Sequence, residues 1–341
     1  MTGAGVPSSR GEVRVERFES AVLRGNLPGD PHVRDLHLYL PPGYAGDTAR
    51  RYPVIWCLSG FLGRGRMFLN DSAWEPGLGD RMDALIARGA AKPAILAMPD
   101  CFTHLGGSQY INSPGLANYA DYVVGELVPL VDTRYRTLTG AAHRGVMGKS
   151  SGGFGAITFG LTRPDVFGAV ASHAGDMAFD LCYQRDFLPA LRAIRRAGGV
   201  AEWLRAFFGS PRKRGSDITA INVIAMAANY SPNVGAPPAY CDLPFDLQTG
   251  AVDANVWERW LAFDPVRLID RHADNLRRLR LLYLDCGTED EFGLELGARQ
   301  AVARLRALGI PHEYQEFEDG HMNTPYRYDV SLAKLSAALA A

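Results

Sequence analysis

Residues 144–156 read Arg-Gly-Val-Met-Gly-Lys-Ser-Ser-Gly-Gly-Phe-Gly-Ala, in which an apolar strand runs directly into the pattern Gly-x-Ser-x-Gly and then into a helix. Gly148 and Gly152 lack a Cβ atom, so the chain can turn sharply there and hold Ser150 in a strained conformation with its hydroxyl exposed. The helix that follows points its amide groups back at the turn. We interpret this stretch as a nucleophile elbow with Ser150 as the nucleophile.

Two other interpretations of this stretch were weighed. Gly148-Lys149-Ser150 also matches the end of the phosphate-loop pattern, but that pattern requires a glycine where this chain has His143, which excludes it. A tight strand-to-helix turn without chemistry is the remaining alternative. The flanking strand and helix, together with the partner residues found downstream, favour the elbow.

The composition is that of a globular chain. Its 341 residues are 47% hydrophobic, enough for a sizeable core in one large domain or two ordinary ones. With a formal net charge of -1, neither nucleic acid nor an anionic membrane is expected as a partner, and the one basic run, 212–214, is expected to be a solvated loop. Five scattered cysteines without a Cys-x-x-Cys pair argue against a disulfide framework or a zinc site. The N-terminus has no apolar signal-peptide core and no run is long enough to span a membrane, so we expect a cytoplasmic protein.

Strands and helices alternate along most of the chain. Residues 1–11 are rich in Gly, Ser and Pro and are expected to be disordered, and strands at 13–23 and 33–40 are expected to form an antiparallel edge. The apolar run 52–58 is typical of a strand buried on both faces of a parallel sheet. The other predicted strands are 94–98, 143–147, 169–172, 280–284 and 313–317, and the predicted helices are 78–88, 116–131, 152–161, 294–308 and 329–340. Repeated strand–helix–strand units predict an α/β fold with a mostly parallel, doubly wound sheet and sites at the carboxyl ends of its strands.

A long interval interrupts this alternation. About a hundred residues separate strands 169–172 and 280–284, whereas connections usually take roughly 2 to 6 residues. We therefore expect a helical cap inserted at about 177–275 into a domain of residues 12–341. Helices are predicted within it near 187–197, 201–208, 218–228 and 256–261. Most of its aromatic residues are expected to pack the cap onto the sheet, but four are predicted to bind substrate, namely Trp203, Phe208, Trp257 and Trp260.

The base that activates the serine is identified by chain order. A serine hydroxyl needs a base that is oriented by an acid, and on this fold the order is serine, acid, histidine. His272 precedes the strand expected to deliver the acid, and His312 begins a strand at the edge away from Ser150. His321 follows strand 313–317 and therefore lies at the same sheet edge as Ser150. We predict that His321 is the base.

The acid is expected after Leu284, where four carboxylates follow one another closely: Asp285, Glu289, Asp290 and Glu291. Their order along the chain does not choose among them. The oxyanion needs two backbone N–H donors. One is predicted at Ser151, after the nucleophile, and the other at Phe61, in the loop after strand 54–58.

Two further pairs of side chains follow sheet strands, and each was considered as a metal pair. They are His173 with Asp176, and Asp100 with His104. The sequence contains no metal motif such as His-Glu-x-x-His, so capping and loop hydrogen bonds are the favoured interpretation. We expect neither a metal nor a cofactor.

A family resemblance narrows these predictions. It is carried by the segments Ser59–Phe61, Met98–Asp100, Gly106–Tyr110, Glu126–Pro129, Arg134–Arg136, Gly148–Gly153, Arg163–Phe167 and Asp285–Phe292. These resemble the putative esterase family of α/β-hydrolases, which includes S-formylglutathione hydrolases (esterase D), feruloyl esterases, enterochelin esterases and bacterial mycolyltransferases. The similarity covers roughly residues 36–172 and 281–326 and leaves the cap outside it.

The resemblance implies an α/β-hydrolase fold and a choice of acid. In this family the acid commonly lies three residues after a glycine that follows the strand, which here is Asp290 after Gly287. Ser59 stands where many relatives have histidine, and Lys149 stands where esterase D usually has it. Both departures argue against the S-formylglutathione hydrolase subgroup.

The expected function is therefore that of a serine carboxylic-ester hydrolase acting on a small-molecule ester through an acyl-enzyme. The predicted triad is Ser150, His321 and Asp290. Two alternatives stay open at this point. An acyltransferase that moves the acyl group to an alcohol would use every residue named, and a ligand-binding homologue would keep the fold without the chemistry.

Overall fold

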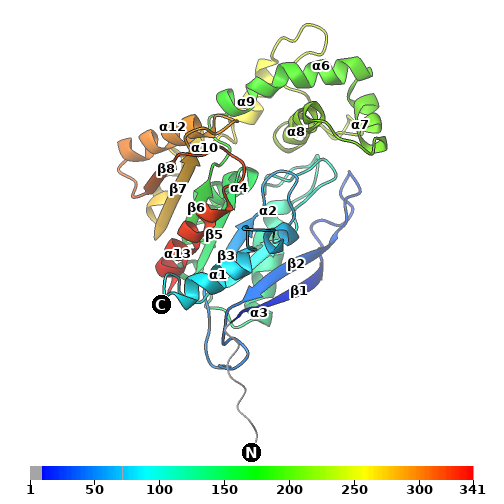
Figure 1. Ribbon diagram of the computed structural model, residues 1–341. Coiled ribbons are helices and arrows are strands. Elements are labelled where there is room, and N and C mark those ends of the chain that lie inside the picture. Colours follow the sequence, from blue (N-terminus) through cyan, green and yellow to red (C-terminus); the bar gives the residue numbers. More distant parts are fainter. Residues whose placement is uncertain (1–9, 71, 341) are drawn as a thin grey trace, which may run out of the picture.

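An eight-stranded sheet forms the centre of the computed structural model, which describes residues 10–70 and 72–340 (Figure 1). The strand order is β1-β2-β4-β3-β5-β6-β7-β8. The pairs β1·β2 and β2·β4 are antiparallel, and every pair from β4 to β8 is parallel. The strands are β1 (Glu12–Glu19), β2 (Val33–Leu40), β3 (Val54–Leu58), β4 (Ile95–Pro99), β5 (Arg144–Lys149), β6 (Ala169–His173), β7 (Leu281–Gly287) and β8 (Glu313–Phe317). The predicted α/β-hydrolase fold is confirmed.

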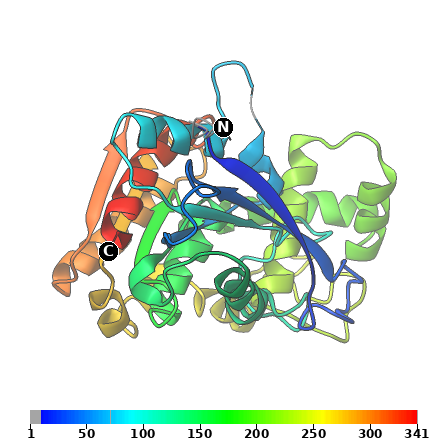
Figure 2. The same cartoon turned by 90° about the horizontal axis from the view of Figure 1, so that it is seen from below.

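Helices cover both faces of the sheet, because the central strands are apolar on both sides. Ile55 and Cys57 of β3 pack in one core with α1 (Leu78–Ala87) and α13 (Tyr328–Leu339). Val54 and Trp56 alternate with them and face the other core. That second face is covered by α3 (Val128–Arg134), α4 (Ser151–Thr162) and α12 (Leu294–Ala307). Figure 2 shows α1 (cyan) and α13 (red) together on one side of the sheet.

The cap lies beyond the carboxyl ends of the parallel strands, at the top of Figure 1. Its helices are α5 (Phe179–Cys182), α6 (Phe187–Ala197), α7 (Val200–Gly209), α8 (Gly215–Tyr230), α9 (Ala254–Leu261), α10 (Pro265–Leu268) and α11 (Ala273–Arg277). The helices α6 to α9 share a hydrophobic core with the end of β7 and with α12. The cap is therefore a packed unit that lies over one end of the sheet.

Most predicted elements differ from the observed ones by one to three residues at an end, and two differ more. The first strand ends at Glu19 instead of residue 23, because the Ser20 hydroxyl donates to Glu126 and accepts the Leu23 amide, which starts a turn. The single helix predicted at 116–131 is divided into α2 (Tyr119–Asp121), a π-helical segment (Tyr122–Leu127) and α3. Pro129 has no N–H to donate to the preceding turn, which accounts for the break.

The predicted disorder at the N-terminus falls largely outside the described residues, since residues 1–9 are not among them. Within the described part, the Gly11 amide donates to the Asp83 carboxylate at 2.9 Å. Gly11 is thus attached to α1.

Candidate active site

The turn between β5 and α4 has the geometry that its sequence predicts. Ser150 has φ 58° and ψ −127°, a region that residues with side chains rarely occupy. The turn needs its glycines, because a Cβ atom on Gly148 would lie 2.4 Å from Gly152 and one on Gly152 would lie 2.1 Å from the Leu58 carbonyl. The Ser150 amide donates to the His173 carbonyl at 3.0 Å, which fixes the turn to β6. The serine is therefore held in a strained position by the sheet itself.

His321 and Asp290 form a buried pair next to this turn. His321 lies after β8, and its Nδ1 is 2.7 Å from Asp290 Oδ2. The other carboxylate oxygen of Asp290 accepts the Phe292 amide at 2.9 Å. Burial disfavours the ionised carboxylate, but the hydrogen bond and charge of His321 outweigh it and hold the pKa of Asp290 below its ordinary value. The His321 amide donates to Glu291 at 2.6 Å, which fixes the loop that carries the ring.

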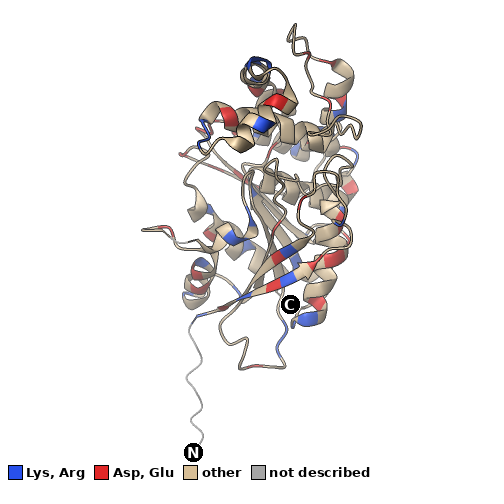
Figure 3. Cartoon of the chain, turned by 90° about the vertical axis from the view of Figure 1, so that its right-hand side faces the viewer, with Lys and Arg blue, Asp and Glu red and all other residues tan. Residues whose placement is uncertain are grey.

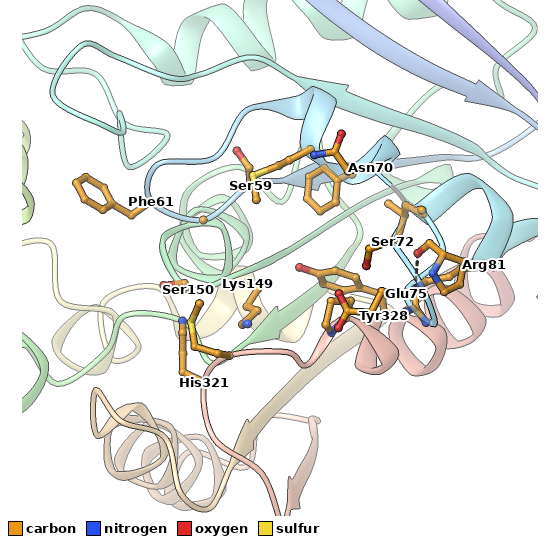
Figure 4. Close-up of a pocket in the computed structure, with 18 residues that line it drawn as sticks. Ser59, Phe61, Asn70, Ser72, Glu75, Arg81, Lys149, Ser150, His321 and Tyr328 are labelled. Carbon is orange, nitrogen blue, oxygen red and sulfur yellow. Dashed lines mark hydrogen bonds between the residues drawn. The ribbon is translucent and has the colours of Figure 1, made fainter. Parts of the chain in front are cut away.

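Ser150 and His321 open into one cavity of about 410 Å³ (Figure 4). Both lie at one end of it, and Ser72, Glu75 and Arg81 lie at the other. The walls come from three parts of the chain, namely the β3–α1 connection with the first turn of α1, the end of β5 with Ser150, and the segment from His321 to the first residue of α13. The lining residues are Ser59, Gly60, Phe61, Met67, Phe68, Asn70, Ser72, Glu75, Pro76, Gly77, Leu78, Arg81, Lys149, Ser150, His321, Met322, Pro325 and Tyr328.

The β3–α1 loop passes directly over the serine. A Cβ atom on Gly60 would lie 3.4 Å from Ser150 Cβ and 3.2 Å from the Lys149 carbonyl, so this close approach favours glycine. Farther along the loop, the Leu62 and Gly63 amides donate to the carbonyls of Gly106 and Gly60. Phe61 lines the cavity, and Ser151 is the first residue of α4. Both predicted oxyanion donors thus belong to the two segments that meet at Ser150.

Sequence comparison identifies the family. A family model described as Putative esterase matches residues 31–337. The chain belongs to this family. Esterase Rv1288 of Mycobacterium tuberculosis is 26% identical over 95% of this chain and 58% of its own length. The chain thus spans about three-fifths of the curated relatives it matches across nearly its whole length.

Solved structures of esterases share the fold of this chain. A ferulic acid esterase superposes with a TM-score of 0.63 at 18% identity, covering 96% of this chain and 99% of its own. An S-formylglutathione hydrolase from Agrobacterium tumefaciens superposes with a TM-score of 0.58 at 17% identity, covering 97% of each chain. The resemblance inferred from sequence motifs is therefore confirmed at the level of family and fold.

The four cap aromatics predicted to bind substrate in this chain lie apart from the cavity. Trp203, Trp257 and Trp260 are buried in the cap core, where the indole of Trp260 donates to Ser231 and that of Trp257 to Asp180. Phe208 is 49% exposed and packs on the His104 ring. None of the four lines the cavity that Ser150 and His321 share, within the described residues. Aromatic side chains supply large apolar surfaces, and here the cap uses three of them for its own core.

The cavity walls that sequence reasoning missed come largely from loops. Met67, Phe68 and Asn70 of the β3–α1 connection are examples, and neither periodicity nor a motif marks them. One signal was available. The connection from Leu58 to Leu78 is far longer than the roughly 2 to 6 residues usual for a strand-to-helix loop, and long loops at the carboxyl edge of a sheet often carry binding residues.

Asp285, the main competitor for the role of acid, belongs to a different group. Its Oδ1 is 2.7 Å from Nδ1 of His173, and its Oδ2 accepts from Arg327 and from the Tyr283 hydroxyl. The other ring nitrogen of His173 is 2.8 Å from the Ser331 hydroxyl. This carboxylate therefore pairs with His173 instead of His321.

The side chains weighed as metal pairs are engaged otherwise. Asp176 accepts from Tyr183, Gln109 and Ser151, and His104 pairs with Asp30. Among residues 10–70 and 72–340, no group of three or more His, Cys, Asp or Glu side chains is arranged to hold a metal ion. No helix in the same part of the chain is long and apolar enough to cross a bilayer.

Proposed function

We propose that this chain hydrolyses carboxylic esters through an acyl-enzyme on Ser150. The observation that carries the proposal is a strained serine that opens into the same cavity as a histidine whose other ring nitrogen is held by a buried carboxylate. Membership in a family of esterases supports it. In the expected tautomer, His321 donates from Nδ1 to Asp290 and presents an unprotonated Nε2 to the serine.

Each group then has a defined role. Nε2 of His321 takes the proton from Ser150 as Oγ attacks the ester carbonyl carbon, and the carbonyl oxygen becomes an oxyanion. The amides of Phe61 and Ser151 stabilise that oxyanion. The bond to the alcohol breaks, the alcohol leaves with the proton from His321, and the acyl group remains on Ser150. Water then gives a proton to His321 and attacks the acyl carbon, which releases the acid and restores the serine.

The cavity limits which esters fit. Phe68, Leu78 and Met322 give it apolar walls, and Arg81 lies at the end far from Ser150. Arg81 is held by Asp329 at 3.2 Å and by the Pro76 carbonyl, so its charge is largely compensated. A small-molecule ester with an apolar group next to the scissile bond is the substrate that we propose.

The location that we propose is the cytoplasm. All five cysteines are buried and none forms a disulfide. Unpaired cysteines are usual in compartments that keep thiols reduced.

A matched pair of histidine variants tests this function. Hydrolysis of p-nitrophenyl acetate by His321→Gln should fall by several orders of magnitude. His312→Gln, in which the replaced ring lies directly before β8 and contacts the Ile310 carbonyl, should stay within about twofold of the parent. Equal activity in both variants, or a parent protein without esterase activity, would refute the proposal.

A further inference from the structure

The cap carries a strong local positive charge that the ester site does not use. Residues 187–217 contain seven Lys and Arg and two acidic residues, a formal charge of +5 in a chain whose total is -1. In Figure 3 the cap lies at the top, and blue segments mark its basic residues. Charge of one sign gathered on a small surface attracts ligands of the opposite sign.

This charge surrounds two adjoining concavities between α6, α7 and α8, which we call the cap groove. One has a volume of about 510 Å³ and the other about 250 Å³, and they share Trp203, Arg214 and Asp217. The charged residues that line the groove are Arg192, Arg196, Arg212, Lys213, Arg214 and Asp217. Five cations and one carboxylate leave a net charge of +4 along its walls.

Most of this charge is uncompensated. Arg192, Arg196 and Arg212 make no side-chain hydrogen bond or ion pair with any residue in 10–70 or 72–340. Several surface arginines elsewhere are paired with carboxylates, for example Arg259 with Asp242 at 2.8 Å and Arg299 with Glu316 at 2.7 Å. The groove therefore presents guanidinium groups that are available to a ligand.

Packed aromatic side chains form the bottom of the cap groove. Trp203 is buried, and its ring stacks on Phe207 with centroids 5.0 Å apart. Lys213 lies over the Phe207 ring and donates to the carbonyls of Phe207 and Ser210, so the basic run 212–214 is held against α7. Groups on packed helices hold a ligand more precisely than groups on a free loop.

We propose that the cap groove binds a ligand that carries two or more phosphate groups. The planar guanidinium fork matches the oxygens of phosphate in a bidentate way. Arg192 and Arg196 on α6 line one concavity together with Arg214, and Arg212 lines the adjoining one, which Arg214 shares. A phosphate monoester carries roughly −1.5 to −2 at neutral pH, so two of them match the groove's charge. A single carboxylate would leave most of it uncompensated. This site is separate from the ester cavity and does not depend on the proposed function.

Titration calorimetry of the full chain with sodium tripolyphosphate tests the proposal. Saturable one-to-one binding is expected, and it should weaken as salt is added because the arginines are exposed. Citrate, which carries carboxylates instead of phosphates, should bind at least about tenfold more weakly. Binding without saturation, or equal affinity for citrate, would overturn the proposal, as would binding to long duplex DNA without binding to tripolyphosphate.

Two adjacent arginines of α6 provide the matched control. Arg196 lines the groove, whereas Arg195 contacts the Gln248 carbonyl outside it. Arg196→Gln should raise the dissociation constant for tripolyphosphate by about tenfold, and Arg195→Gln, which removes the same charge, by less than about twofold. Equal weakening would show a general field effect and refute a built site. Ester hydrolysis should be unchanged in both variants, which reports that the fold is intact.

Discussion

Two sets of serine, histidine and aspartate lie near the carboxyl ends of the strands of this sheet. Ser150 and His321 open into the cavity, Asp290 is buried behind His321, and we call the three residues the open set. Ser331, His173 and Asp285 lie between β6, β7 and α13, and we call them the buried set. The histidine-to-carboxylate distance is 2.7 Å in both.

The sets differ in access and in backbone strain. Ser331 is 0% exposed and lies within helix α13, whereas Ser150 lines the cavity at φ 58°. In the buried set, Asp285 also accepts hydrogen bonds from Arg327, which directly precedes α13, and from Tyr283 of the same strand. Residue types and pair distances are therefore insufficient to mark a catalytic site. A strained serine with room for an ester is what separates the two sets.

The buried set still supports the open one. His173 accepts the Ser150 amide on its backbone carbonyl at 3.0 Å while its side chain pairs with Asp285. A rigid β6 end thus holds the elbow in place. Substitutions in the two sets should separate chemistry from stability.

The largest contrast is expected between the two serines. Ser150→Ala should lower kcat for p-nitrophenyl acetate by several orders of magnitude because it removes the nucleophile. Ser331→Ala should keep kcat within about threefold and lower the free energy of unfolding by about 1 kcal/mol, the usual cost of a lost hydrogen bond. Steady-state turnover and urea denaturation measure the two effects. If Ser331→Ala abolished turnover in a folded protein, the roles of the two sets would have to be revised.

The two aspartates should also differ, one in its effect on turnover and the other in its effect on stability. Asp290→Asn keeps the shape but leaves His321 in the wrong tautomer, and about a ten-thousandfold loss of kcat is the precedent in serine proteases. Asp285→Asn should retain kcat within about tenfold but lower the free energy of unfolding by about 3 to 5 kcal/mol, because it breaks a buried ion pair. Near-parental turnover in Asp290→Asn together with a collapse in Asp285→Asn would identify Asp285 as the acid.

A smaller contrast is expected between the cavity and the cap core. Met322 lines the cavity and is 59% exposed, so Met322→Ala should change KM several-fold between short and long p-nitrophenyl esters with little effect on stability. Trp257→Phe should lower the melting temperature without changing that ratio, since it opens a gap in the cap core. If only Trp257→Phe changed the ester preference, the substrate would be in contact with the cap, as the sequence predicts, and not with the cavity.

A smaller effect is expected on the free energy of unfolding at acid pH, through the carboxylate of the buried set. Burial opposes ionisation of Asp285, but its pairing with His173 outweighs this and lowers the pKa of the carboxyl in the folded chain. A lowered folded pKa contributes stability above the unfolded value of about 3.9, and this contribution is lost as the pH falls through the folded value. The free energy of unfolding should therefore fall as the pH drops below about 4. Asp285→Asn should flatten that fall, and an unchanged slope would contradict the assignment.

The sequence predicts regular elements well where one pattern dominates. The strand 313–317 and the helix 187–197 match β8 and α6 residue for residue. Pro311 and Gly320 bound the strand, and an amphipathic stripe followed by Gly198 bounds the helix. The elbow is equally clear, since its glycines are required by close backbone contacts. The family and the fold follow from the same motifs and are confirmed.

The side-chain environment of the site was less accessible to sequence reasoning. The four carboxylates after Leu284 were equivalent by chain order until a family resemblance selected Asp290, because the direction of a loop side chain has no periodic signature. Four aromatic cap residues were predicted to bind substrate, whereas three of them fill the cap core and much of the cavity wall comes from the β3–α1 connection. The sequence did not predict the buried set either, since Ser331 contacts His173 only because α13 packs on β6.

The most direct test of the open set is reaction with a fluorophosphonate followed by peptide mapping. A strained serine beside an oriented base should attack phosphorus and become labelled, so the account predicts label on Ser150 alone. Ser331 should stay unlabelled because it is buried, and Ser151 because its side chain bonds Asp176. Label on Ser331 or Ser151, or no label on the folded protein, would contradict the claim that access and strain at Ser150 define the active site.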